Sequence, residues 1–487
     1  MENTRYLIID PVTRVEGESR VIAILDENSE VSEVYYQILT TRGYESFCIG
    51  RAVEDLPRIT STVCGVCSWA HHFVSGKAVD ELLGRKPPIP AYKLRELAYY
   101  IQIIDSHLLH LGVMALPDFI LHDSQPVDRN IIGLIKKEPR LATLLLKTRS
   151  LVKEIEKIIG GKPIHASFII PGGVTRSLNR EDVEKINRLL RELEGIVSEI
   201  TVFFNEKVVK SSVFENYLQN DAYKLETYYM SLVSRDNSLT FYDGLIKIID
   251  RNGREVAVFK PIDYSKYIGE YMNNWSYSKF PYFKPNGWKG FNEESVIRVG
   301  PLARLNIVDK IPSEKAGEEY GKILDYFGKK PIHNTIAYHW ARVVETIYCI
   351  EKMLELLEDP DIVSKETVDL TGEPRYEGVG VIEAPRGILI HHYKADDRLI
   401  ATHVNIITPT TFNNTAINVE LKKVVKNVLK NREIDRNVLN KIEIDIRAYD
   451  PCNSCAAHLF NLENNTFKIL VIDPFRKEKN TVFIKIT

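Results

Sequence analysis

The segment Asp450-Pro-Cys-Asn-Ser-Cys-Ala-Ala-His458, close to the end of the chain, contains one of two CxxC motifs. The other motif, Cys64-Gly-Val-Cys67, lies close to the beginning. A histidine follows each pair, His71 after the first and His458 after the second. Four thiolates of this kind can hold a soft transition metal. The two motifs therefore predict a metal site to which both ends of the chain contribute.

Two other interpretations compete with this one when the cysteine pairs are considered alone. A CxxC pair is the usual half of a structural zinc site, and it is also a thiol–disulfide redox motif. Structural zinc sites usually close short loops, whereas almost the whole chain separates these two pairs, which weighs against zinc. The remaining cysteines, Cys48 and Cys349, have no partner in spacing and are expected to be buried free thiols.

Composition and charge describe an ordinary globular protein. The chain has 487 residues, of which 44% are hydrophobic and 27% charged, and its net charge is -2, so no surface for nucleic acid is predicted. Only six cysteines occur, which excludes a disulfide scaffold. The first residues lack an apolar signal region, and no run approaches the roughly 18 apolar residues that span a bilayer. These features predict a cytoplasmic protein without a membrane span, unless a partner subunit carries an export signal for both.

The hydrophobic pattern predicts a mainly helical protein with peripheral α/β pieces. Long helices are expected over 91–115, 141–159, 180–210 and 332–358, and a shorter one over 73–83. Strands are expected over 20–26, 31–39 and 377–408, and Asn252-Gly253 predicts the turn of a hairpin between 245–249 and 255–259. The aromatic-rich segment 264–291 is expected to be packed but irregular. No linker divides the chain.

The motifs around the cysteines resemble those of one known family. They are, in chain order, Asp10-Pro-Val-Thr-Arg-Val-Glu-Gly17, Arg42-Gly-Tyr-Glu45, Val299-Gly-Pro-Leu-Ala-Arg-Leu-Asn306, Glu383-Ala-Pro-Arg-Gly387, Pro409-Thr-Thr-Phe-Asn413 and Asp450 to His458. Together they resemble the large subunit of nickel–iron hydrogenases, over residues 6 to 458. The likeness is greatest to the cytoplasmic, deazaflavin-independent, viologen-reducing group. It implies that family's fold, built on a central helical bundle.

The resemblance implies a nickel–iron centre that cleaves dihydrogen reversibly and heterolytically. Cys64 and Cys452 would be terminal nickel ligands, and Cys67 and Cys455 would bridge nickel to iron. The iron would also carry one carbon monoxide and two cyanides. Thiolates suit such a centre because they are soft donors that can bridge two metals.

Further residues take catalytic roles by resemblance. Cys452 would accept the proton, and Glu16 would carry it onward. A carboxyl group in a dry site can have its pKa raised enough to transfer protons near neutral pH. Arg386 would lie over the metals, either as an electrostatic group or as a base; arginine is a poor base because its pKa exceeds about 12.

The resemblance also implies residues that support the centre. Asp450 would pair with Arg386, Thr410 would hydrogen-bond a cyanide, and His71 would donate to a bridging cysteine. Family members often have an aspartate where this chain has Ser106, although the cytoplasmic groups tend towards serine. The other histidines are expected to have packing roles.

A separate magnesium site is implied as well. Glu45 and His458 would be its side-chain ligands, and the backbone carbonyl near Ile406 would complete the contribution of the protein. Oxygen-rich coordination suits magnesium. The alternative is a plain salt bridge between Glu45 and His458.

The family divides the chain into a catalytic domain, 1–458, and a C-terminal extension, 459–487. Family precursors are cut after the last histidine, here between His458 and Leu459, by an endopeptidase that acts with other maturation factors. The extension contains two predicted strands, 467–472 and 481–486. It is either the tail of an uncut precursor, which we favour, or a hairpin that the mature protein retains.

By resemblance, electrons would leave through an iron–sulfur small subunit, because this chain has no further cysteine cluster. A deazaflavin-reducing hydrogenase subunit is the alternative within the enzyme family. Outside it, the rivals are a non-catalytic relative such as the quinone-site subunit of respiratory complex I, a hydrogen sensor, and a zinc-stabilised scaffold. The non-catalytic relatives lack the cysteines, and the sensors tend to lack the tail.

Overall fold

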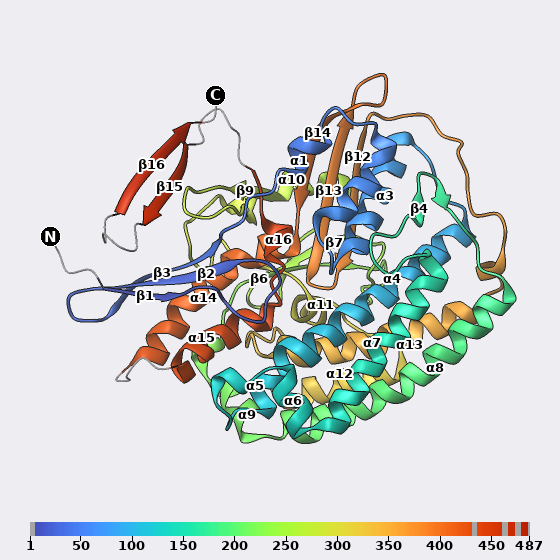
Figure 1. Ribbon diagram of the computed structural model, residues 1–487. Helices are drawn as coiled ribbons and strands as arrows, with labels where there is room; N and C mark the ends of the chain where they lie inside the picture. Colours follow the sequence, from blue (N-terminus) through green and yellow to red (C-terminus); the bar gives the residue numbers. More distant parts are fainter. Residues whose placement is uncertain (1–4, 431–435, 460–465, 473–478, 486–487) are drawn as a thin grey trace.

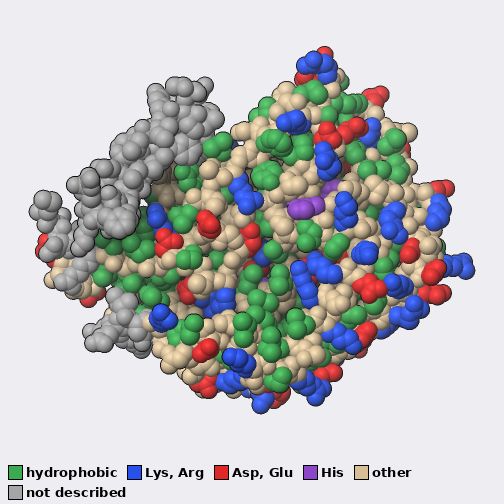
Figure 2. All heavy atoms as spheres, in the orientation of Figure 1, with side chains coloured by type: hydrophobic (Ala, Val, Ile, Leu, Met, Phe, Trp, Pro, Cys, Tyr) green, Lys and Arg blue, Asp and Glu red, His purple; other side chains and the backbone are tan. Residues whose placement is uncertain are grey.

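The computed structural model shows a helical body with small sheets at its edges (Figure 1). It describes residues 5–430 and 436–459, together with the backbone of the strands at 466–472 and 479–485. Lys and Arg side chains alternate with Asp and Glu over the face in Figure 2, with no large patch of one sign.

A layer of long helices forms the body. Helix α4 packs against α13 and α7, α7 packs against α8, and α8 and α12 both contact α13. The helices of this layer and their extensions are α4 (Ile89–Leu109), a π-helical turn (His110–Ala115), α5 (Leu116–Ile120), α6 (Ile131–Lys137), α7 (Pro139–Gly160), α8 (Arg180–Phe203), a second π-helical turn (Phe204–Val209), α9 (Ser212–Gln219), α12 (Glu314–Phe327) and α13 (Ala337–Glu358). The predicted long helices are thereby confirmed.

The start of α8 illustrates how the sequence fixes a helix boundary. The Asn179 side chain accepts a hydrogen bond from the backbone N–H of Asp182, and the Asp182 carboxylate accepts one from the backbone N–H of Asn179. This capping box satisfies N–H groups that have no partner within the helix.

A second group of elements carries the motifs of the sequence. Helix α3 packs against strands β12 and β13, and α14 packs against α15 and β3. The helices of this group are α1 (Tyr44–Cys48), α2 (Leu56–Thr60), α3 (Ser68–Leu83), α10 (Tyr264–Tyr267), α11 (Pro301–Ile307), α14 (Pro409–Leu429), α15 (Arg436–Tyr449) and α16 (Asn453–Ala456). In Figure 1, α14 and α15 lie beside the N-terminal sheet, whereas α3 lies beside β12 and β13, above the helical layer.

The strands form several small sheets, each antiparallel except for the pairing of β11 with β6. The three larger sheets are β1 (Arg5–Ile9), β2 (Ser19–Leu25) and β3 (Val31–Ile38); β11 (Ile297–Arg298), β6 (Tyr228–Val233), β7 (Leu245–Ile249) and β8 (Glu255–Phe259); and β12 (Glu377–Ala384), β13 (Gly387–Ala395) and β14 (Ala401–Ile407). The pairs are β4 (Ile169–Ile170) with β5 (Gly173–Val174), β9 (Ile268–Tyr271) with β10 (Phe280–Phe283), and β15 (Thr466–Ile472) with β16 (Lys479–Lys485).

Most of the predicted strands are confirmed, including the hairpin of β7 and β8 around Asn252-Gly253. The prediction for 264–291 is wrong in part. That segment contains α10 and the hairpin of β9 and β10, and its aromatic rings stack, as Tyr271 does on Trp288 with centroids 4.4 Å apart. The two strands of the C-terminal extension are present and pair with each other, while the turn predicted between them lies largely outside the described residues.

Across the part of the chain that the structure describes, one continuous helical stretch, Ile89–Ile120, is long and apolar enough to cross a membrane. Its most apolar window is 83% buried inside the protein. Packing against α13 and α7 accounts for that composition.

Candidate metal centre

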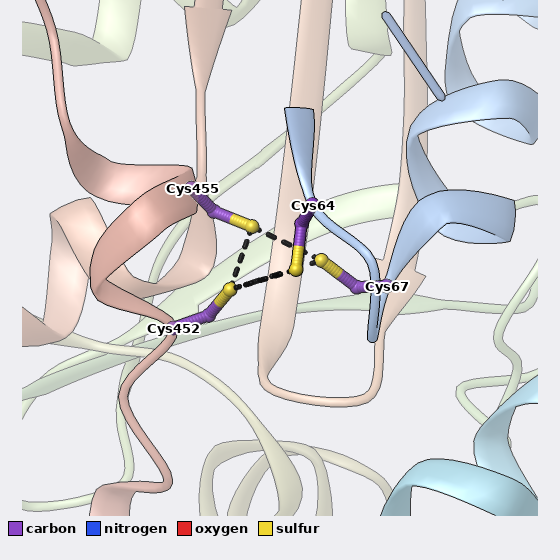
Figure 3. Close-up of side chains that lie close together, drawn as sticks. All are labelled: Cys64, Cys67, Cys452 and Cys455. Carbon is purple, nitrogen blue, oxygen red and sulfur yellow. Dashed lines mark hydrogen bonds between the residues drawn. The ribbon is translucent and has the colours of Figure 1, made fainter. Parts of the chain in front are cut away.

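The four cysteines of the two CxxC motifs come together in the interior (Figure 3). Cys64 and Cys67 belong to the loop that leads into α3, and Cys452 and Cys455 lie at the start of α16 and within it. Their sulfur atoms all lie within 4.8 Å of one another, and all four residues are buried. The predicted site made from both ends of the chain is therefore confirmed.

The individual sulfur distances show how compact this four-cysteine cluster is. Cys64 and Cys452 are 3.4 Å apart, Cys67 and Cys455 are 3.0 Å apart, and Cys452 and Cys455 are 2.7 Å apart. Four soft donors at this spacing fit soft transition metals, including a pair of metals that share thiolate ligands. The four sulfur atoms thus fit the nickel–iron centre that the resemblance implies.

Burial and mutual contact divide the thiols into two kinds. Hydrogen bonds from the neighbouring thiols lower the pKa of Cys64 well below its usual value, whereas burial raises the pKa of Cys452 and of Cys455. Because metal ligation requires thiolates, binding of a metal cation here releases protons.

Glu16 lies directly beside the cluster. Its Oε2 accepts hydrogen bonds from the Cys452 thiol, at 3.0 Å, and from the Ser454 backbone N–H, at 3.1 Å. Its backbone also pairs with Cys452 and accepts from the N–H of Asn453. The loop after β1 is therefore fastened to the loop that carries Cys452.

Arg386 reaches the cluster from the turn between β12 and β13. Its Nε donates to the Asp450 carbonyl at 2.6 Å, and its Nη2 donates to Asp450 Oδ1 at 3.1 Å. Ser106 makes a longer contact, 3.4 Å from Nη1. Although burial raises the pKa of Asp450, the charges of Arg386 and His110 hold it well below its usual range. Arg386 and Asp450 therefore form a buried ion pair.

Two glycines allow the backbone to approach Arg386 closely. Gly387 has φ +132° and Gly300 has φ +97°, values that side chains rarely adopt. A Cβ atom on Gly387 would lie 2.5 Å from Val299 Cγ2, and one on Gly300 would lie 2.6 Å from the Arg386 carbonyl oxygen. Two motifs distant in sequence are thus packed backbone against backbone.

Arg304, from the same motif as Gly300, fixes the strand end that precedes Arg386. Its guanidinium donates to Glu383 at 2.6 Å, to the Ala384 carbonyl at 3.1 Å and to the Pro385 carbonyl at 3.0 Å. It also pairs with Glu345 of α13. Burial raises the pKa of Glu383 to about 7. Sequence reasoning quoted both motifs but missed this contact between them.

Thr410 and His71 are also adjacent to the cluster. The Thr410 hydroxyl, at the start of α14, accepts from the Cys452 backbone N–H at 2.9 Å. His71 Nδ1 lies 3.1 Å from His391 Nε2, and His391 Nδ1 lies 2.5 Å from the Tyr393 hydroxyl. A buried row of polar groups thus leads from α3 to β13. His391 was expected to have only a packing role, and its position in this row carried no sequence signal.

The predicted magnesium residues meet at a separate position. Glu45 Oε2 is 3.0 Å from His458 Nδ1, and Glu45 Oε1 accepts from the Ile406 backbone N–H at 2.9 Å. His458 Nε2 is buried and has no hydrogen-bond partner within the described chain. Carboxylate and imidazole groups of this kind fit a divalent cation.

Lys279 shares this second site and was not predicted. Its ammonium donates to Glu45 Oε1 and to Asn405 Oδ1, both at 2.8 Å, and lies 3.2 Å from Glu270. Although burial raises the pKa of Glu45, His458 and Lys279 lower it well below its usual range. Glu45 is therefore an anion whose charge Lys279 already offsets in part.

Comparison with known proteins identifies the family. Residues 42–124 and 218–458 match the family described as nickel-dependent hydrogenase, and residues 6–40 match one described as HoxL-like. The chain therefore belongs to the nickel-dependent hydrogenases. Within them it is the catalytic large subunit of a nickel–iron hydrogenase, an oxidoreductase that acts on dihydrogen, and its four cysteines form the nickel–iron site.

Similar proteins share almost the whole chain. One is a subunit of the F420-non-reducing hydrogenase from Archaeoglobus profundus, which is 40% identical over 92% of this chain and 94% of its own. Another belongs to the F420-non-reducing hydrogenase from Methanothermobacter thermautotrophicus and is 35% identical, over 96% and 98%. The structure of an NAD+-reducing nickel–iron hydrogenase in its H2-reduced state superimposes with a TM-score of 0.87, at 34% identity, over 93% of this chain and all of that one.

Proposed function

We propose that proton transfer in this hydrogenase begins at Cys452 and continues to Glu16. The observation that carries this proposal is the 3.0 Å contact between the Cys452 sulfur and Glu16 Oε2. Nickel and iron, when bound by the four cysteines, would accept the electron pair of the H–H bond. Cys452 then takes the proton, and Glu16 lies within hydrogen-bond reach to receive it.

Arg386 acts electrostatically rather than as a base. Burial lowers the pKa of Arg386, but Asp450 and the cysteines together raise it above its usual value, so the guanidinium stays charged. A fixed cation beside the thiolates stabilises the negative charge that they carry. Asp450 holds the guanidinium in place through two hydrogen bonds.

The finer composition of the centre follows the family. The iron carries carbon monoxide and cyanide ligands, and Thr410, whose hydroxyl proton is free to point away from the Cys452 N–H, is the residue expected to donate to a cyanide. His71 is expected to tune the cysteines through its position on α3. Glu45, His458 and the carbonyl at Ile406 bind magnesium, supported by the unpaired Nε2 of His458.

The chain works as one component of a multisubunit hydrogenase. An iron–sulfur subunit accepts the electrons, because the four cysteines form the one cysteine cluster among the described residues. Maturation factors load the metals, and an endopeptidase removes the extension after His458. The complex works in the cytoplasm.

The deazaflavin-independent group remains the preferred assignment for the electron acceptor. Relatives at 40% and 35% identity are named F420-non-reducing, F420 being the deazaflavin coenzyme. An NAD-reducing relative from Cupriavidus necator is 34% identical over 93% of the chain. Assays of the purified complex with viologen, F420 and NAD separate the three: viologen reduction without F420 reduction is expected, and F420 reduction would contradict the assignment.

A further inference from the structure

Arg342, on α13, has a buried charge that the proposed chemistry leaves unexplained. Its side chain is 0% exposed, and its Nε, Nη1 and Nη2 atoms all lack a hydrogen-bond partner among the described residues. A guanidinium carries five N–H donors, and a buried cation without partners strongly destabilises a fold. The Tyr338 ring, 5.7 Å from the guanidinium carbon, offers a face to the charge but no acceptor for the five N–H groups. Acceptors outside the described part of the chain must therefore serve Arg342.

Other buried polar atoms on neighbouring elements also lack partners. Asp450 Oδ2, His339 Nδ1 and His107 Nδ1 are buried and have no hydrogen-bond partner in the described chain. Asp450 is the acid with the largest electrostatic effect on Arg342, yet the two side chains form no direct ion pair. His339 stacks on His110, whose Nδ1 lies 3.0 Å from Asp450 Oδ1.

The chemistry of these atoms identifies what binds between them. Arg342 can only donate hydrogen bonds, and the Asp450 carboxylate can only accept them. An anion would satisfy Arg342 but not Asp450 Oδ2, and a cation would do the reverse. Water donates and accepts, and a buried water typically makes about three hydrogen bonds to such groups.

We propose that buried water bridges Arg342 to Asp450 Oδ2, and that Arg342 thereby positions Arg386. The other oxygen of Asp450, Oδ1, accepts from Arg386 Nη2, so water held on Oδ2 fixes the carboxylate that holds the guanidinium. Arg342, on α13, acts on the centre through Asp450 rather than by contact with the cysteines. It is a positioning residue, and this part of the inference rests on the proposed role of Arg386.

A high-resolution structure of the metal-loaded complex tests the water directly. The expected result is at least one ordered water within about 3.2 Å of both an Arg342 nitrogen and Asp450 Oδ2. A direct Arg342–carboxylate bond, or a bound anion that contacts Arg342 alone, would overturn the proposal. This test requires no variant and does not depend on what Arg386 does.

Three variants test the positioning role. Arg342→Met is expected to lower the kcat of hydrogen-dependent viologen reduction about 10- to 100-fold, because a small displacement of a catalytic group has an effect of this size. The KM for viologen should stay unchanged. The nickel signal in electron paramagnetic resonance should also change, at an unchanged nickel content. Arg342→Lys should restore part of the rate, since it keeps the charge.

Ile350→Val, a conservative change at a buried apolar side chain two turns further along the same helix, is the matched control. It should leave both the rate and the nickel spectrum as in the native complex. Equal behaviour of Arg342→Met and Ile350→Val would refute the positioning role, and so would an Arg386→Lys complex with the native rate. If Arg342→Met does not fold, Arg342→Lys provides the test. An Arg342→Lys complex that lacks the bridging water but keeps the native nickel spectrum and the native rate would contradict the proposal.

Discussion

At the scale of the residue, the contact between Cys452 and Glu16 is the first step of the proposed proton path out of the metal centre. The thiol and the carboxylate are 3.0 Å apart, and the backbone pairing of the two residues maintains that distance. The proposed proton transfer requires a carboxyl group at this position that both accepts and releases a proton, and an amide of the same shape cannot replace it.

Glu16→Gln should therefore lower hydrogen-dependent viologen reduction about 100-fold or more, which is the usual contribution of a positioned acid or base. Nickel and iron content should not change, because Glu16 is not a ligand. Glu18→Gln, two residues along on an exposed side chain, is the control and should keep the native rate. A Glu16→Gln complex with more than half of the native rate would rule out Glu16 as the proton carrier.

The burial of the His72 ring predicts how the stability of the protein depends on pH. Its ring is buried, with Nδ1 2.9 Å from the Pro57 carbonyl and Nε2 accepting from the Ile169 N–H, so the neutral form is required. Burial lowers the pKa of His72 to about 4, whereas an unfolded histidine has a pKa near 6.5. The unfolded state therefore binds more protons between these values, and stability is lost as the pH falls from about 6.5 to about 4.

The free energy of unfolding, measured with denaturant between pH 7 and pH 5, should fall by about 1.4 kcal/mol per pH unit from this residue alone once the pH is below about 6.5. His71 and His110, whose pKa values burial also lowers to about 4, add to the slope. His72→Gln should flatten the slope. A stability that stays constant or rises towards pH 5 would show that these rings are not held neutral.

The sequence predicted the metal ligands because their spacing is local and their chemistry is distinctive. It could not predict Lys279 or His391, whose contacts join segments more than 100 residues apart, or the burial of Arg342. An isolated lysine, histidine or arginine carries no sign of being buried. Only the packed structure shows which of them is buried and what each one contacts.

At the scale of the element, the turn between β12 and β13 is held by close backbone packing on the start of α11. Gly387→Ala should lower both the midpoint of thermal unfolding and the activity, because its Cβ would lie 2.5 Å from Val299 Cγ2 at φ +132°. Gly321→Ala is the control: Gly321 lies within α12 with open space around it, so alanine should stabilise the helix by about 0.5–1 kcal/mol. Equal effects of the two changes would contradict the packing argument.

The sequence predicted helices and strands correctly where the hydrophobic periodicity extended over many residues, or where a turn had a specific sequence. The four long helices and the hairpin at Asn252-Gly253 are of this kind. It failed for β9 and β10, where Pro281 lies inside a strand and aromatic residues occupy both faces. The hairpin packs through its rings on Trp288, with Tyr271 stacked on it and Tyr282 tilted against it, a tertiary effect that overrides local pattern.

At the scale of the whole molecule, the C-terminal extension is the segment whose removal on maturation we propose. His458 is anchored by its backbone N–H to the Tyr277 carbonyl and by its ring to Glu45. If the extension is removed on maturation, intact-mass spectrometry of nickel-loaded protein from the native host should show a chain that ends at His458. Nickel-loaded protein of full length would instead mean that the hairpin of β15 and β16 is retained.

The most direct test of the account is the metal content of the complex purified from its native host, measured by inductively coupled plasma mass spectrometry. The large subunit should contain nickel at about one atom per chain. Iron should exceed nickel, because the small subunit contributes clusters of its own. Cys452→Ala should abolish nickel binding, and Cys349→Ala, at a buried thiol outside the cluster, should not. About one zinc per chain, with no nickel, would contradict the assignment of the four cysteines to a nickel–iron centre.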